Sequence, residues 1–270
     1  MTPLDVLATH LGERYSPLTR RAFHRQARQF LLSAGDKDTY CRADVLAFLD
    51  QLIRGGYRAD SIAVMLAGVR ALFDANDWIW PLKRRDSRLG LPEQEPYAPT
   101  LFSEDIRKLI LGARQTSGFP RALVALSTTW GLRTRELSNV FKAGCDGQYL
   151  RVQTVKGGRL REHTIPPELQ TVLNFPAVKV SPTHLQRTFA ALMRTHVRES
   201  LPEEGWHAVR RSLVTGLFEQ GLPAEVIHRW MGWRTSGGAH VIAARYFHPS
   251  PAQLDARVLD VHPFLAFWDH

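Results

Sequence analysis

Apolar residues recur at helical spacing along most of this chain. Stretches 16–35, 43–56 and 59–77 place apolar side chains three or four residues apart. The first stretch begins with Ser16 and Pro17 and ends at Gly35. Serine caps the free N–H groups of a first turn, proline tolerates the first helical position, and glycine ends a helix. We therefore predict a bundle of four or five helices over residues 1–85.

The pattern stops at residues 81–100, PLKRRDSRLGLPEQEPYAPT, which are rich in proline, glycine and charge. Such a stretch has no periodicity and is typical of a connection between domains. We assign residues 86–100 to a linker and residues 101–270 to a second domain. Helical spacing returns there at 102–114, 119–130, 182–199, 207–220, 223–231 and 238–245.

Residues 149–165 differ from the helical stretches. Two runs containing β-branched residues flank Gly157–Gly158, a pair that favours a two-residue hairpin turn. The expected fold class is therefore mainly α with a small β-hairpin or sheet. The second domain is expected to be mixed but mostly helical.

Charge narrows the class of partner. The 270-residue chain has a formal net charge of +9 and a pI of about 10.0. Residues 1–97 hold 14 Lys/Arg against 12 Asp/Glu, and residues 98–270 hold 21 against 14. An excess of cations in one domain favours a polyanion as partner, nucleic acid before membrane.

Two cysteines, Cys41 and Cys145, lie far apart in no metal-ligand spacing. They predict neither a disulfide framework nor a zinc site. The N-terminal residues lack the basic segment and apolar run of a signal peptide. No apolar run approaches the ~18 residues that a spanning helix needs. We expect a cytoplasmic protein that does not enter a membrane.

Four local patterns carry candidate chemistry. They are TTWGLRTREL with Arg133 and Glu136, TVKGGR with Lys156, HAVRR with His207 and Arg210, and MGWRTS…AARYFHP with Trp233 and Tyr246. In this order they resemble the tyrosine recombinase, or phage integrase, family. The N-terminal helices resemble the core-binding domain of that family, so the resemblance covers nearly the whole chain.

The residue types suit phosphodiester chemistry. Displacement at phosphorus builds negative charge on the non-bridging oxygens, and the planar arginine fork matches those oxygens while staying protonated. Arg133 and Arg210 come from separate segments and could hold one phosphate from two sides. His207 precedes Arg210 by three residues, on the same face of a helix, where it can donate to a phosphate or accept a proton.

The resemblance implies the remaining roles. Tyr246 would be the nucleophile that forms a 3′-phosphotyrosine and frees a 5′-hydroxyl. Lys156 would be the general acid, and Glu136 would orient an arginine or the histidine. Trp233 stands where many members have a histidine, and its indole N–H can replace that donor. The family needs no metal, ATP or other cofactor. Its partners are double-stranded DNA and further copies of the protein, from dimer to tetramer.

The chain departs from the family pattern in several places. The stretch from Lys156 to His207 is short for the family. Tyr246 follows Trp233 by 13 residues, which is longer than usual, and SGGAH at 236–240 has the character of an insertion. His240 is therefore an alternative site histidine.

Two other functions remain open. One is an enzyme like the type IB topoisomerases, which share the chemistry. The other is a non-catalytic DNA-binding regulator, since residues 219–234 resemble a helix-turn-helix.

Further contacts are expected outside the central motifs. Lys83, Arg84, Arg85 and Arg211 are candidates for the DNA backbone, although solvated charges explain them nearly as well. Residues 247–270 carry too many apolar side chains for a free tail: Val258, Leu259, Val261, Phe264, Leu265, Phe267 and Trp268. We expect this tail to dock on a neighbouring protomer. The alternative is that it packs on its own domain.

Overall fold

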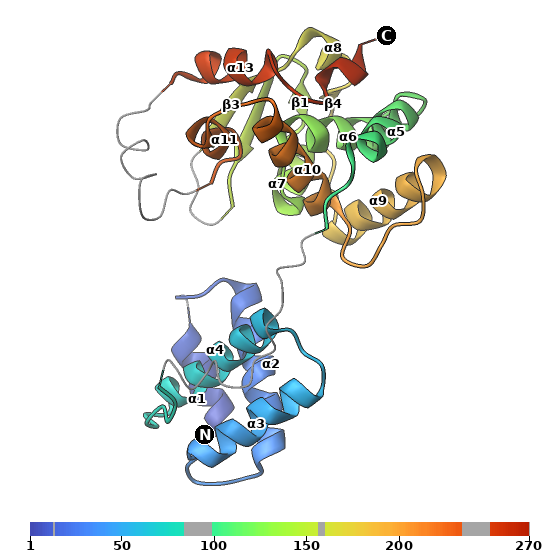
Figure 1. Ribbon diagram of the computed structural model, residues 1–270. Coiled ribbons are helices and arrows are strands. Elements are labelled where there is room, and N and C mark those ends of the chain that lie inside the picture. The colour runs from blue at the N-terminus through green and yellow to red at the C-terminus, as the bar shows by residue number, and fades with distance from the viewer. Residues whose placement is uncertain (13, 84–98, 156–159, 234–248, 270) are drawn as a thin grey trace. The chain divides into compact units, whose positions relative to one another are not determined.

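The computed structural model describes residues 1–12, 14–83, 99–155, 160–233 and 249–269. The chain divides into two compact units, residues 1–97 and 98–270, which we call the N-terminal unit and the C-terminal unit (Figure 1). Of the predicted linker 86–100, only Pro99 and Thr100 lie within the described residues.

The N-terminal unit is helical throughout its described elements: α1 (Pro3–Leu11), α2 (Pro17–Ala34), α3 (Arg42–Arg54) and α4 (Ala59–Ala75). Helix α2 begins as its sequence predicts, because the Ser16 hydroxyl accepts from the Thr19 N–H and Pro17 starts the helix. Aromatic rings fill the core between the helices. Phe30 of α2 packs edge-on against Phe48 and lies next to Phe73.

The C-terminal unit holds the remaining elements. Its helices are α5 (Ser103–Arg114), α6 (Phe119–Trp130), α7 (Thr134–Ala143), α8 (Pro167–Gln170), α9 (Pro182–His196), α10 (Trp206–Glu219), α11 (Ala224–Trp230), α13 (Pro251–Leu259) and the 3-10 helix η2 (Leu265–Trp268). The predicted helix at 238–245 lies outside the described residues.

Two small antiparallel pairs complete this unit. Strand β2 (Tyr149–Gln153) pairs with β3 (Leu160–Thr164), and Val152 stands opposite Arg161. Strand β1 (Cys145–Asp146) pairs with β4 (Asn174–Phe175). The mainly helical fold with a small β-hairpin is therefore confirmed. The β1–β4 pair was not predicted, because two-residue strands leave no alternation to detect.

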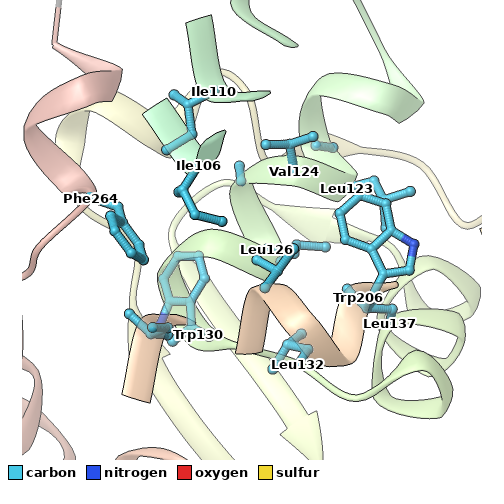
Figure 2. Close-up of a cluster of buried hydrophobic side chains, with 14 of the residues drawn as sticks. Ile106, Ile110, Leu123, Val124, Leu126, Trp130, Leu132, Leu137, Trp206 and Phe264 are labelled. Atoms are coloured by element: carbon cyan, nitrogen blue, oxygen red, sulfur yellow. The ribbon is translucent and has the colours of Figure 1, made fainter. Parts of the chain in front are cut away.

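The core of the C-terminal unit lies around α6, which is apolar on nearly all sides. Leu123, Val124, Leu126 and Trp130 are all fully buried. Figure 2 shows these side chains among residues of α5, α7 and α10, with Trp206 at one side. Because α6 is surrounded by packed side chains, its position in the unit is fixed. Its C-terminal end leads directly into the candidate site.

The C-terminal residues return to this core. Val258, Phe264 and Trp268 belong to the same buried cluster as the residues of α6, and Figure 2 draws Phe264 as part of that cluster. The Arg114 guanidinium of α5 donates to the Phe267 carbonyl at 3.1 Å. In the structure the apolar side chains of the tail therefore pack on their own unit, which was the alternative to docking on a neighbour.

No helix among the described residues is long and apolar enough to cross a bilayer.

Candidate active site

The site begins at the C-terminal end of α6. Gly131 follows this helix in the left-handed conformation, with φ 56° and ψ 41°. A Cβ at this position would lie 2.7 Å from Met231 Cε, which is the end of a flexible side chain, so it is the left-handed backbone conformation that favours glycine. Leu132 enters the core, and Arg133 becomes the N-cap of α7. The GLR motif thus turns the chain sharply and places Arg133 beside a helix start.

Glu136 is the centre of the site and has no solvent exposure. Its Oε1 accepts from the Arg133 guanidinium at 2.8 Å and from the Val155 N–H at 3.3 Å. Its Oε2 accepts from the Arg133 N–H at 2.9 Å. A buried carboxylate must be paired to be tolerated, and this one joins the start of α7 to the segment that follows β2.

Two further arginines approach Glu136. Arg161 Nη2 lies 3.8 Å from Oε2, and Arg210 Nη1 lies 4.0 Å from the same atom. We call Arg133, Arg161 and Arg210 the arginine cluster. Three cations around one carboxylate leave an excess of positive charge in a largely buried place, which suits the binding of an anion.

Arg210 is held by the C-terminal ends of two helices. Its Nη1 donates to the Gly131 carbonyl after α6, and its Nη2 donates to the Met231 carbonyl after α11 at 2.8 Å. These are carbonyls that a helix leaves without an internal partner. Burial lowers the pKa of Arg210 to about 9, with a smaller contribution from Arg133, and Glu136 opposes the shift. Arg210 therefore remains a cation at neutral pH.

His207 lies one helical turn before Arg210 on α10 and is exposed. Desolvation lowers the pKa of His207, the nearby Arg210, Arg211 and Arg133 lower it further, and Glu136 opposes them. The imidazole is consequently neutral near pH 7, with one nitrogen free to accept a proton and the other able to donate.

Trp233 closes one side of the cluster. The Arg210 guanidinium carbon lies 5.6 Å from the centre of the Trp233 ring, within the range of a cation–π contact. The backbone N–H of Trp233 donates to the His228 carbonyl at 3.0 Å, which fixes the backbone after α11. The structure thus brings together Arg133, Glu136, His207, Arg210 and Trp233.

The other predicted site residues lie elsewhere or beyond the described ranges. Lys156, Tyr246, the alternative His240, Arg84 and Arg85 fall outside the described residues. Lys83 is exposed. Arg211 donates through Nε to the Pro99 carbonyl at 2.7 Å, so that part of its side chain anchors the start of the C-terminal unit.

Arg161 belongs to the site but was not predicted. Its Nη1 donates to the Trp230 carbonyl, and burial lowers its pKa to about 10 while Glu136 opposes the shift. In LREHT, hydropathy alone would place Leu160 inward and Arg161 outward. The observed register does the reverse, since Arg161 stands opposite the buried Val152 and Leu160 is exposed. Only the pairing of the strands could have revealed this side chain.

No group of three or more His, Cys, Asp or Glu able to hold a metal ion occurs within the ranges that the structure describes.

Comparison with known proteins gives fold-level likenesses. No protein-family model and no curated protein matches this sequence. Among solved structures, the Tn1549 transposon integrase bound to transposon right-end DNA superposes with a TM-score of 0.60 at 16% identity. That match covers 97% of this chain and 99% of the integrase chain. The chain has the tyrosine recombinase fold. A lambda integrase dimer (residues 75–356) bound to a core site is similar too, with a TM-score of 0.61, 16% identity, and coverage of 91% and 94%.

Proposed function

We propose that this chain is a site-specific tyrosine recombinase that cleaves and rejoins DNA strands through a covalent 3′-phosphotyrosine. The observation that carries this proposal is the convergence of Arg133, Arg210 and the exposed His207 around buried Glu136. Structures with this fold, the Tn1549 and lambda integrases, were solved with DNA. The +9 net charge of the chain supports a DNA partner.

In the proposed step, the Tyr246 oxygen attacks phosphorus and the bond from phosphorus to the 5′-oxygen breaks. His207 accepts the phenol proton, and Lys156 donates a proton to the departing 5′-oxygen. Arg133 and Arg210 balance the charge that develops on the non-bridging oxygens. The reverse reaction, with a different 5′-hydroxyl, joins the new strand, and the phosphotyrosine conserves the bond energy for it.

The neutral state of His207 supports its role as the base. Because partial desolvation and the neighbouring arginines lower the pKa of His207, the imidazole can accept a proton at neutral pH. Trp233, stacked near Arg210, would donate its indole N–H to the phosphate. Lys83, Arg84, Arg85 and Arg211 would add contacts to the DNA backbone, and synapsis would require dimers that pair as tetramers.

The test uses nicked duplexes that tile the DNA flanking the gene, incubated with the protein and separated on a denaturing gel. The wild-type chain should give a covalent adduct, because the nick lets the cleaved fragment leave. Tyr246→Phe should abolish the adduct while the dissociation constant for the same duplex changes little. Tyr149→Phe is the matched control, since Tyr149 is an exposed tyrosine on β2.

Each alternative gives a different outcome in this assay. A non-catalytic regulator binds the duplexes without any adduct. A topoisomerase-like enzyme forms an adduct on every duplex and relaxes supercoiled plasmid as a monomer. An adduct that survives Tyr246→Phe and is lost with Tyr149→Phe would move the nucleophile to Tyr149.

A further inference from the structure

Arg161 has an unusual set of contacts for a buried arginine. Its side chain is 10% exposed, yet Nε and Nη2 have no hydrogen-bond partner among the described residues. Within the described ranges Nη1 alone is bonded, to the Trp230 carbonyl. Buried N–H groups without partners are costly, and a native structure that keeps them calls for a reason.

The position of Arg161 supplies that reason. Its unbonded Nη2 lies 3.8 Å from Oε2 of Glu136, too far for a hydrogen bond but close enough for a small movement to form one. At present Arg133 holds both oxygens of this carboxylate. Arg133 is also the most exposed member of the arginine cluster, at 28%, so an arriving anion meets its guanidinium first.

Phosphate binding would remove a partner from Glu136, because the phosphate and Glu136 compete for the same Arg133 guanidinium. If the Arg133 guanidinium turns to a phosphate, the hydrogen bond to Oε1 is lost, and a fully buried carboxylate loses its strongest partner. Arg210 cannot easily replace that partner, because two backbone carbonyls hold its guanidinium. Among the described residues Arg161 has unbonded donors, and its Nη2 lies 3.8 Å from the other carboxylate oxygen, Oε2.

We infer that Arg161 is a positioning residue. Its guanidinium neutralises the Glu136 carboxylate when the Arg133 guanidinium leaves Glu136 to bind a DNA phosphate. The inference rests on the proposed function and adds a residue to that site. Arg161 acts through Glu136 and has no assigned contact with DNA.

Arg161 also joins β3 to the C-terminal end of α11 through its hydrogen bond to the Trp230 carbonyl. Arg161 and Arg210 bond the consecutive carbonyls of Trp230 and Met231, at the end of the helix that precedes Trp233. Gly232 follows with φ +62°, and a Cβ there would lie 2.7 Å from Arg161 Nε. This tether alone would give Arg161 a purely structural role, so the experiment has to separate the tether from the exchange at Glu136.

The experiment is a double-mutant cycle of Arg161→Met and Glu136→Gln, measured as the single-turnover rate of adduct formation on a nicked duplex. Arg161→Met should slow cleavage about 10- to 100-fold, while the dissociation constant for DNA changes less than about threefold. In the Glu136→Gln background the same substitution should lower the cleavage rate less than about threefold, because no carboxylate charge remains for Arg161 to neutralise. Arg161→Lys keeps the charge and should recover most of the rate.

Arg151→Met is the matched control. Arg151 lies on the neighbouring strand and also pairs with a glutamate, Glu162 at 2.8 Å, but its side chain is 64% exposed. Its substitution removes one arginine and one ion pair from the same hairpin and should leave the cleavage rate unchanged.

Three results would overturn the inference. They are wild-type cleavage by Arg161→Met, an equal loss in both backgrounds of the cycle, and a loss in Arg161→Lys as deep as in Arg161→Met. The last two would leave Arg161 as the tether to Trp230 only. Failure of the proposed function is seen separately, because the wild-type protein would then form no adduct with any duplex.

Discussion

The two units of this chain differ in what they bury. Among the described residues, the core of the N-terminal unit is apolar and aromatic, and Gln26 is its one buried polar side chain. The C-terminal unit buries Glu136, Arg210, His163, Asp255, Glu204 and His262. Buried charges add little net stability compared with apolar packing, so their concentration in one unit makes that unit the place to look for a functional site.

The buried polar groups of the C-terminal unit also bind distant segments together. His163 on β3 shares a 2.8 Å hydrogen bond with Asp255 on α13, and the same carboxylate accepts from the Thr164 N–H. His262 contacts the Thr129 carbonyl at 3.0 Å and accepts from the Phe264 N–H at 3.2 Å. The N-terminal unit is held instead by ring contacts such as Phe30 with Phe48.

The largest expected effect comes from deleting residues 252–270. The deletion removes Val258, Phe264 and Trp268 from the core, and the two aromatic side chains alone cost about 3–5 kcal/mol each. The sum approaches the ~5–15 kcal/mol that stabilises a typical domain. Calorimetry should show that the C-terminal unit no longer unfolds cooperatively while the transition of the N-terminal unit persists. An unchanged second transition would mean that the tail is free to serve assembly alone.

Phe30→Ala should have the next largest effect, in the opposite unit. Phe30 is fully buried, and its loss should lower the free energy of unfolding of the N-terminal unit by about 3–5 kcal/mol. Urea titrations followed by circular dichroism should show an earlier first transition and an unmoved second one. A shift of both transitions would contradict the separation of the two cores.

Acidification should weaken the C-terminal unit selectively. Burial lowers the pKa of His262 from 6.5 to about 4 and lowers that of His163, although its bond to Asp255 opposes the latter shift. Because the unfolded chain then binds protons more readily, stability falls as the pH drops below about 6.5. For His262 the loss amounts to ~3 kcal/mol near pH 4.

Melting curves from pH 7 to pH 4 check this expectation. The melting temperature of the C-terminal unit should fall more steeply than that of the N-terminal unit, whose histidines His10 and His24 are not buried. His262→Gln, which cannot be protonated, should flatten the slope. An identical slope in that variant would assign the pH dependence to other groups.

The smallest effect is expected on the surface of α5. Arg107 and Glu104 form an exposed ion pair at 3.2 Å, one turn apart. Arg107→Ala should change the free energy of unfolding by less than about 0.5 kcal/mol, because water screens such pairs. Urea denaturation measures this change in the free energy of unfolding. A loss above about 1 kcal/mol would mean that this exposed ion pair contributes as much as a buried one.

The two units also differed in how well the sequence predicted them. Stretches 16–35 and 59–77 correspond closely to α2 and α4, because each buries one apolar stripe of a helix. In the C-terminal unit the motifs located Arg133, Glu136, His207, Arg210 and Trp233, whose roles stay predictions. Arg161, His163 and Asp255 could not be predicted, since their burial depends on strand register and on α13 packing against β3.

The contacts of the C-terminal residues also constrain synthesis of the protein. Domains generally fold as units while the ribosome adds residues from the N-terminus. The N-terminal unit has all of its core once residue 82 is made, but β3 waits for Asp255 and the end of α6 waits for His262. A chain released before residue 255 would therefore hold a complete N-terminal core, while β3, which carries Arg161 of the arginine cluster, would lack its contact with Asp255.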